Sequence, residues 1–279
     1  MNSSNMKISC LSVSLFPKIQ SGEMSIKEYA NLCKDLDLDA FDLGLILLKN
    51  HTPKYIQQIQ KDIHDVGIPL CMVTTYPDFT HPDPMQRQRE FDFLVHDIAL
   101  ASAVGAKFLR ITAGQAHPNT SEKDGIDWTV ANFMKAAPIS DQYGIQMVFE
   151  DHSKPGAWDY MDFANPPHIF LAIARQLRGT SIGINFDTAN ILVAGEDKTI
   201  EVLDQVIDQV ETIHVAETGT IGKMDPVPLG TGIVPFHEIF AYLKSKKFKG
   251  WLCLEEWGNK GEDGVAKAVD FVKETLAKA

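Results

Sequence analysis

The second half of the chain contains four short strand-like runs, and each ends in a residue that can bind a metal: Gln146-Met-Val-Phe-Glu150, Ile182-Gly-Ile-Asn-Phe-Asp187, Glu211-Thr-Ile-His214 and Trp251-Leu-Cys-Leu-Glu255. An ionisable side chain at the carboxyl end of a buried parallel strand is costly unless it has a partner there. Four such strands in succession, separated by helix-like segments, predict that these side chains meet at one site. Three carboxylates and one imidazole suit a divalent cation such as Mn²⁺, Mg²⁺, Co²⁺ or Zn²⁺.

Strand-like and helix-like segments alternate along the rest of the chain as well. Four further strands are predicted at Lys7–Leu15, Ala40–Leu45, Pro69–Thr74 and Lys107–Thr112. The predicted helices are Ser25–Leu36, Pro53–Val66, Asp83–Val104, Ile126–Tyr143, Pro167–Leu177, Thr199–Gln209, Pro235–Lys244 and Glu262–Leu276. Repeated β-then-α units imply a parallel sheet, and about eight units favour a closed (β/α)₈ TIM barrel over an open doubly wound sheet. No Gly-x-Gly-x-x-Gly fingerprint follows the first strand, which argues against a dinucleotide-binding fold.

Length and composition limit the class of protein. The 279 residues are expected to form one barrel domain, with residues 1–6 as a short flexible lead. The formal net charge of −11 argues against nucleic acid as the main partner. The four cysteines are scattered without a Cys-x-x-Cys pair, which fits a reduced cytoplasmic protein. No apolar run approaches the length of a membrane span, so no membrane partner is expected.

Strand parity bears on which of two neighbouring glutamates faces the predicted site. Trp251 and Glu255 share one face of the last strand, and Glu256 lies on the other. We expect Leu252 and Leu254 to face the helices, which directs Glu255 toward the mouth of the barrel. The alternative is that Trp251 faces the helices, and Glu256 would then point into the mouth.

Five segments in the chain occur in a fixed order: Val148-Phe-Glu-Asp-His152, Asn185-Phe-Asp-Thr-Ala-Asn190, Ile213-His-Val-Ala-Glu217, Pro228-Leu-Gly-Thr-Gly232 and Gly250-Trp-Leu-Cys-Leu-Glu255. In these segments the chain resembles the xylose-isomerase-like TIM-barrel superfamily. It is most similar to the branch of sugar-phosphate isomerases and epimerases, which includes ketose 3-epimerases and hydroxypyruvate isomerase. In this family the corresponding Glu, Asp, His and Glu bind one divalent ion, often Mn²⁺. The resemblance assigns that role to Glu150, Asp187, His214 and Glu255, with Mn²⁺ as the first choice.

The resemblance also implies a reaction, the isomerisation or epimerisation of a sugar. A divalent ion that holds the carbonyl and adjacent hydroxyl oxygens of a ketose stabilises the enediolate formed when the α-proton leaves. In ketose 3-epimerases the first and last Glu of the set remove and return that proton. By this resemblance, Glu150 and Glu255 are the catalytic acid/base pair. The sequence does not name the sugar, show whether it is phosphorylated or identify the ion.

Several other residues are candidates for contacts with the substrate. His152, two residues after Glu150, is expected to contact the substrate. Glu217 is expected to orient a metal ligand or to bind a substrate hydroxyl, and the alternative is a loop carboxylate in solvent. Arg110 lies in the middle of a strand, where it needs a carboxylate partner or an anionic ligand. We expect Arg110 to pair with the carboxylate of a metal-binding residue, and the alternative is that Arg110 binds a phosphate group of the substrate. Aromatic residues that could pack on a sugar ring are Phe16, Tyr76, Trp158 and Trp257.

Two positions depart from the ketose 3-epimerase pattern. Those enzymes have a His three residues after the metal Asp, where this chain has Asn190, which can still bind a hydroxyl. They also have an Arg soon after the metal His, where this chain has Thr220, with Lys223 as the nearest cation. The long stretch His152–Pro167 is expected to cover the site as a lid.

Three other functions are alternatives to this one. Inosose dehydration would use the same metal-stabilised enolate and expel a β-hydroxyl, and the sequence does not separate it from epimerisation. The DNA-repair endonuclease branch, of the endonuclease IV type, needs extra His ligands, which are missing at Asn190 and in Asp225-Pro226-Val227. A non-catalytic sugar-binding protein would not need the paired bases. Homo-oligomers are common among such barrels, but the sequence shows no interface.

Overall fold

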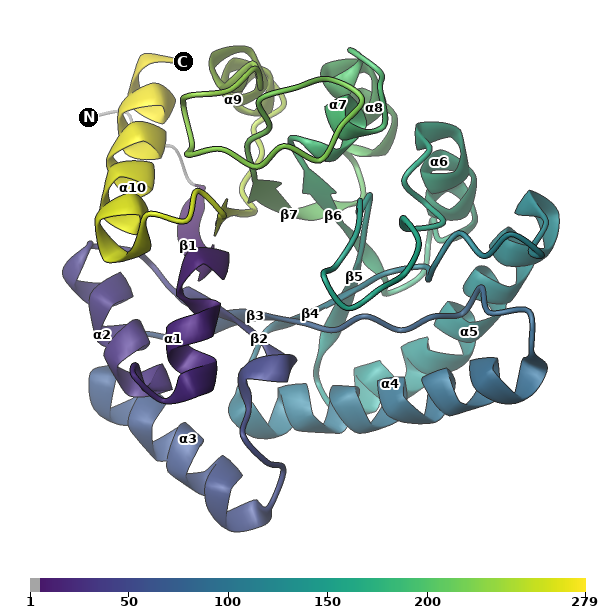
Figure 1. The fold of residues 1–279 in the computed structure, drawn as a ribbon, viewed down its shortest axis with the longest axis horizontal. Coiled ribbons are helices and arrows are strands. Elements are labelled where there is room, and N and C mark those ends of the chain that lie inside the picture. Colours follow the sequence, from purple (N-terminus) through teal and green to yellow (C-terminus); the bar gives the residue numbers. More distant parts are fainter. Residues whose placement is uncertain (1–5) are drawn as a thin grey trace.

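Eight parallel strands form a nearly closed barrel at the centre of the molecule (Figure 1). The structure is a computed structural model that describes residues 6–279. The strands are β1 Lys7–Ser12, β2 Phe41–Gly44, β3 Leu70–Thr74, β4 Phe108–Ile111, β5 Gln146–Glu150, β6 Gly183–Asp187, β7 Val210–Val215 and β8 Trp251–Glu256. The predicted (β/α)₈ TIM barrel is therefore confirmed. Of the predicted flexible lead, residues 1–5 lie outside the described residues, and Met6 is buried.

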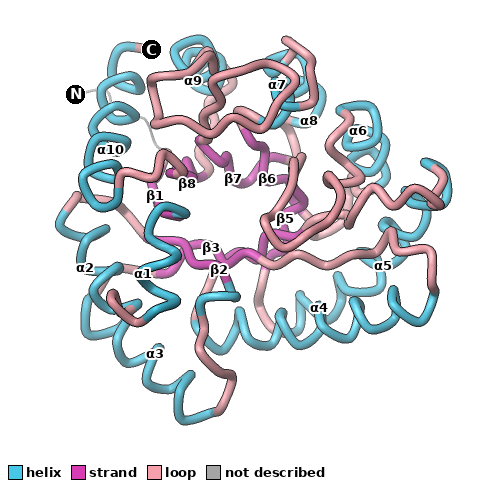
Figure 2. The backbone as a smooth tube through the Cα atoms, in the orientation of Figure 1, coloured by secondary structure: helices cyan, strands magenta, loops and turns pink. Residues whose placement is uncertain are grey.

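The helices form an outer ring around the strands (Figure 2). They are α1 Phe16–Ser21, α2 Ile26–Asp35, α3 Pro53–Val66, α4 Pro84–Val104, α5 Glu122–Gln142, α6 Pro167–Gln176, α7 Asn190–Val193, α8 Thr199–Val206, α9 Phe236–Ser245 and α10 Gly261–Lys278. Short 3₁₀ turns, η1 Val13–Leu15 and η2 Leu45–Leu47, follow β1 and β2. Within residues 6–279, no helix combines the length and the hydrophobicity that crossing a membrane requires.

The first βα connection differs from the sequence-based prediction. The predicted strand Lys7–Leu15 was too long, because β1 ends at Ser12 and is followed by η1 and α1. Pro17 lies in the first turn of α1, and Gly22 ends the helix in a left-handed conformation with φ of 84°. Neither α1 nor α7 was predicted, because helices of six and four residues are too short to show a 3.6-residue hydrophobic period.

Apolar side chains fill the interior of the barrel one layer below the predicted site. Phe108 and Val148 belong to this buried cluster, together with Cys253. Two residues further along β4 and β5, on the same faces, lie Arg110 and Glu150. The barrel is therefore a packed apolar plug toward its amino end and becomes polar where the strands end.

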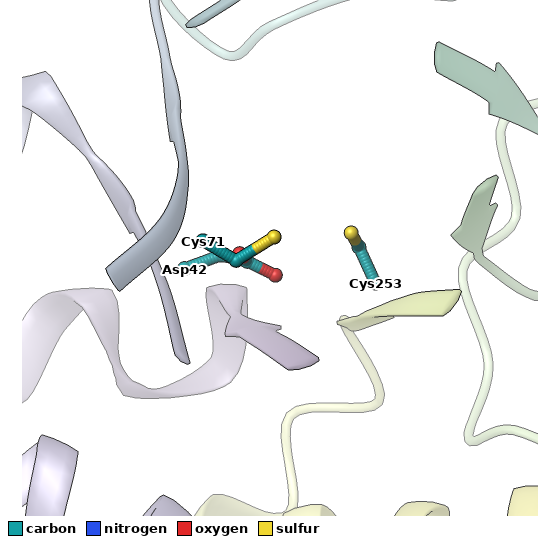
Figure 3. Close-up of side chains that lie close together, drawn as sticks. All are labelled: Asp42, Cys71 and Cys253. Atoms are coloured by element: carbon teal, nitrogen blue, oxygen red, sulfur yellow. The ribbon is translucent and has the colours of Figure 1, made fainter. Parts of the chain in front are cut away.

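β1 and β2 are the two ends of the pairing order β1-β8-β7-β6-β5-β4-β3-β2. Side-chain hydrogen bonds and a backbone bond from the Asp39 amide to the Ile8 carbonyl connect them at the seam of the barrel. The buried carboxylate of Asp42 accepts hydrogen bonds from Ser9 Oγ at 2.6 Å and from the Met72 amide at 3.0 Å. Asp42 lies beside Cys71, and Cys253 faces them across the interior (Figure 3). Burial raises the pKa of Asp42 to about 6 and raises those of both thiols, so the thiols stay protonated.

Replacing Asp42 with Ala is expected to lower the free energy of unfolding by about 1–3 kcal/mol, because Ser9 and the Met72 amide lose their acceptor inside the core. Urea denaturation monitored by circular dichroism measures this change. The matched control is Asp39→Ala, which removes an exposed carboxylate that accepts from the Ile8 amide at 2.8 Å at the same seam. Water can replace that acceptor, so an equal loss in both variants would contradict the role given to Asp42.

Candidate active site

The four predicted ligands meet at the carboxyl ends of β5 to β8. Glu150 ends β5, Asp187 ends β6, and His214 and Glu255 lie close to the ends of β7 and β8. Each offers one donor atom to a set in which all four atoms lie within 4.8 Å of one another. The strand register accounts for this, because Asp187 pairs directly with His214 and His214 pairs with Cys253, two residues before Glu255.

Glu255, and not Glu256, lies with the other three donors. The side chain of Glu256 is on the opposite face of β8, where Oε1 accepts a hydrogen bond from the Gly258 amide at 2.8 Å. Its Oε2 is 3.4 Å from Ser12 Oγ. Trp251 shares the inward face with Glu255 and is part of the apolar plug. Leu252 and Leu254 pack outward into the main hydrophobic core, as expected from the sequence.

The donor set fits a divalent cation. Oδ2 of Asp187 and Nε2 of His214 are buried, and neither has a hydrogen-bond partner among the described residues. A buried polar atom without a partner destabilises a fold, unless a ligand uses its lone pair. Carboxylate oxygens and a neutral imidazole nitrogen are ligands that Mn²⁺, Zn²⁺ and related ions accept. Glu150, Asp187, His214 and Glu255 are the residues that would hold such an ion.

Charges within the cluster shift its pKa values in opposite directions. Burial opposes ionisation of Glu150, but the positive charges of His214 and Arg110 outweigh it and lower the pKa to about 2. Burial also opposes the charge on His214, but Glu150 and Glu255 raise its pKa to about 9. Burial raises the pKa of Asp187 and of Glu255. A dication among these groups would favour ionised carboxylates and a neutral imidazole.

Two further residues hold Glu150 in place. Arg110 is fully buried, and its Nε lies 3.1 Å from Glu150 Oε2, while its guanidinium lies 4.4 Å from the ring centroid of Tyr76. Asn185 donates from Nδ2 to Glu150 Oε1 at 2.8 Å and accepts from Thr212 Oγ1 at 2.6 Å. Arg110 therefore pairs with the carboxylate of Glu150, one of the predicted metal ligands, and this pairing is the first of the two roles expected from the sequence.

Asn185 was not assigned a role from the sequence. It lies two residues before Asp187 in β6, so both side chains point into the barrel. A polar amide at an inward position of a buried strand needs hydrogen-bond partners, and this requirement is the one sign in the sequence that Asn185 has a role in the site. The partner could not be read from the sequence, because Glu150 lies on a neighbouring strand 35 residues away.

A cavity of about 310 Å³ opens beside the four donors, and Asp187 and Glu255 line it. Its walls come from the loops that follow β1, β2, β3, β5, β6, β7 and β8. This is the carboxyl-terminal face, where barrel enzymes place their active sites. The volume is at the lower end of the range for small-molecule sites and suits a ligand of monosaccharide size.

Residues 30–275 match the sequence model of a family described as xylose isomerase-like TIM barrel. The chain belongs to this family. The relative from Escherichia coli strain K12 named "Putative L-ribulose-5-phosphate 3-epimerase SgbU" is 23% identical over 223 residues, covering 73% of this chain and 71% of its own. The protein of the same name from Haemophilus influenzae is 20% identical over 206 residues, covering 70% and 67% of the two chains.

Solved structures of the same fold superpose over almost the whole chain. A D-tagatose 3-epimerase-like protein has a TM-score of 0.78 at 18% identity, with 98% of each chain covered. The IOLI protein, whose structure is described as having a bound zinc atom, has a TM-score of 0.77 at 16% identity, with 98% of this chain and 97% of that chain covered. At these identities the likeness shows the fold.

Within this xylose isomerase-like barrel, the six predicted substrate contacts occupy different places. His152, Asn190 and Glu217 line the cavity. Trp158 lies beside it, with its ring centroid 6.3 Å from those of Tyr76 and His152. Arg110 is buried, Lys223 is exposed, and neither is a lining residue. The first part of the predicted lid, residues 152–157, forms one wall.

Glu217 organises the loop after β7. Its Oε1 accepts hydrogen bonds from the amides of Thr218 at 3.1 Å and Val234 at 3.0 Å, and its Oε2 accepts from the Gly230 amide at 3.2 Å. One carboxylate therefore joins both ends of a loop that contributes Met224 and other residues to the cavity. The sequence could not show this, because the donors are backbone amides up to 17 residues away.

Replacing Glu217 with Ala is expected to weaken protection of residues 218–234 against amide hydrogen exchange by about 1–3 kcal/mol, because three backbone donors lose their acceptor. Hydrogen exchange followed by mass spectrometry would locate the change. The control is Glu238→Ala, at an exposed position in the first turn of α9. Unchanged protection in Glu217→Ala would show that the loop is held by other contacts.

Proposed function

We propose that this protein is a divalent-metal-dependent sugar epimerase or isomerase, which moves a proton at a carbon next to a carbonyl. The observation that carries the proposal is the convergence of Glu150, Asp187, His214 and Glu255, with unpaired buried donor atoms, beside a cavity of monosaccharide size. The sequence relatives, both named "Putative L-ribulose-5-phosphate 3-epimerase SgbU", support the same class of reaction.

The side chains take separate roles in this proposal. A dication held by the four ligands, Mn²⁺ as first choice, would stabilise the negative charge that develops on the carbonyl oxygen as the neighbouring proton leaves. Glu255 lines the cavity and would remove that proton. Asp187 already accepts two backbone hydrogen bonds through Oδ1 and would act as a fixed ligand. His214 would be the other fixed ligand.

Glu150 is proposed as the second proton-transfer group, although it is less accessible than Glu255. Its side chain is fully buried and is not a lining residue of the cavity. It contacts Arg110 through Oε2, and Asn185 and His214 through Oε1. Binding of a cation and a sugar would have to replace the contact with His214 before Glu150 could accept a proton. The first proton transfer is therefore assigned to Glu255.

Exchange of carbon-bound hydrogen in deuterated water tests the proposal. The metal-free protein would be supplied with Mn²⁺, Mg²⁺, Co²⁺ or Zn²⁺ and incubated with a panel of ketoses, aldoses and hydroxypyruvate, followed by NMR. We expect deuterium at the carbon next to the carbonyl of at least one sugar, only when metal is present. A panel without exchange under every metal would reject the proposal, and a product that has lost water would indicate dehydration instead.

A further inference from the structure

We infer that the substrate is an uncharged sugar whose end lying at the cavity entrance is apolar, such as a deoxygenated carbon or an apolar substituent, and not a sugar phosphate. The inference rests on the proposed function and concerns the outer part of the same cavity. Three observations carry it: an apolar entrance, charged lining residues that are mostly carboxylates, and amides at the start of α7 that are already occupied.

The entrance of the cavity is lined by apolar side chains that remain partly exposed. We call this set the apolar rim; its members are Val13, Phe16, Ile46, Met224, Pro226 and Trp257. They come from the segments after β1, β2, β7 and β8, so the rim draws on four separate segments and is not a single exposed residue. Ile46 has 59% of its surface exposed. Several partly exposed apolar side chains that line one cavity mark a binding surface for apolar groups.

The charged groups of the cavity are unsuited to a phosphate. Four carboxylates line it: Asp187, Glu217, Asp225 and Glu255. Lys154 is the one Lys or Arg among the lining residues, all of which belong to the described part of the chain, and its Nζ donates to the carbonyl of Asp159 at 3.1 Å. Even with a bound dication, these side chains keep a net negative charge. This negative charge would repel a phosphate dianion. The cavity also lacks the cluster of Arg or Lys side chains on which phosphate recognition relies.

Backbone amides do not compensate for the missing cations. Barrel enzymes that bind phosphate often use the amino terminus of a short helix at the mouth. Here α7 is the short helix at the cavity, and the amides of Ala189 and Asn190 at its start donate to Asp187 Oδ1 at 2.7 and 2.8 Å. The first turn of α10 carries Glu262 and Asp263, which add negative charge at that helix start.

Paired substrates test both parts of the inference in the metal-loaded protein. The first pair is L-ribulose and L-ribulose 5-phosphate, and the second is L-rhamnulose (6-deoxy-L-fructose) and L-fructose. We expect kcat/KM for hydrogen exchange to be at least roughly tenfold lower for the phosphate than for the free sugar. We also expect it to be roughly tenfold higher for the deoxy sugar, since one apolar group in an apolar pocket is worth about that much. A preference for the phosphorylated or the fully hydroxylated member would overturn the inference.

A variant of the rim provides a second measurement. Ile46→Arg places a cation at the entrance and is expected to raise the phosphate-to-free-sugar ratio of kcat/KM about tenfold and to abolish the preference for the deoxy sugar. The matched control is Met85→Arg on α4, a similarly exposed apolar position outside the cavity lining, which is expected to leave both ratios unchanged. If Ile46→Arg changes only the oligomeric state, the rim is an interface between copies and the inference is wrong.

Failure of this inference can be separated from failure of the proposed function. If no sugar of either pair exchanges hydrogen, the proposed reaction is wrong for these sugars, and calorimetric titration of the same four compounds still measures recognition. Tighter binding of L-rhamnulose than of L-fructose, and of L-ribulose than of L-ribulose 5-phosphate, would then support the inference without turnover. Tighter binding of L-ribulose 5-phosphate would overturn it whatever the reaction is.

Discussion

Replacing Glu255 with Gln is expected to lower kcat for hydrogen exchange by roughly 100- to 10,000-fold, the usual contribution of a positioned general acid or base. Glu255 lines the cavity, and in the proposed mechanism it removes the substrate proton. Gln keeps an oxygen that can bind a metal but cannot accept that proton. Metal content should therefore fall much less than turnover, and elemental analysis beside the exchange assay would show this difference.

The neighbouring residue is the control for that experiment. Glu256→Gln changes the same side chain one position along β8, but Glu256 points away from the cluster and accepts a hydrogen bond from the Gly258 amide. Gln keeps that acceptor, so both turnover and metal content are expected to stay close to those of the unmodified protein. Loss of turnover in Glu256→Gln with normal turnover in Glu255→Gln would mean that the functional carboxylate was assigned to the wrong face.

Replacing Arg110 with Met is expected to lower the free energy of unfolding by about 3–5 kcal/mol, because the substitution leaves the carboxylate of Glu150 buried without that cation. Urea denaturation would measure the loss. In the double variant Arg110→Met with Glu150→Gln, the charge is also removed, so the loss should be smaller than the sum of the two single losses. The control is Arg178→Met, which breaks an exposed pair with Asp208 and should cost no more than about 1 kcal/mol.

The effect of Arg110→Met should depend on pH in one direction. The pKa of Glu150 is held at about 2, below its value of about 4.3 in an unfolded chain. Ionised Glu150 therefore stabilises the fold at pH values above about 4, and this contribution is lost as the pH falls toward 2. The difference in stability between the unmodified protein and Arg110→Met should shrink over that range. A constant difference would show that Arg110 acts through packing and not through its charge.

The barrel and the four converging donors could be predicted because both depend on local patterns. Buried strands that alternate with amphipathic helices specify a parallel sheet, and every carboxyl end of a parallel barrel faces the same way. A residue such as Asp187 at the end of such a strand has only one region to occupy. Side-chain alternation along β8 placed Glu255 and Glu256 on opposite faces, and the expectation that Leu252 and Leu254 face the helices favoured Glu255 as the inward residue.

The contacts that hold and surround these donors could not be predicted in the same way. Asn185 reaches Glu150 across a strand boundary, and Glu217 is bound by amides of its own distant loop. Whether Trp158 would line the cavity or pack beside it depends on how one loop folds over another. Such contacts depend on three-dimensional loop paths, which leave no periodic signal in the chain.

The sequence alone determined the parallel barrel, the end of it that carries the chemistry and the four side chains that gather there, since strand direction and two-residue alternation are properties of the local chain. Only the tertiary structure decided what those side chains touch, how Arg110 and Asn185 orient Glu150, and that the cavity has an apolar rim with a carboxylate-rich lining. The reason is physical: burial and pairing arise between segments far apart in sequence, and they exist only after the loops have packed.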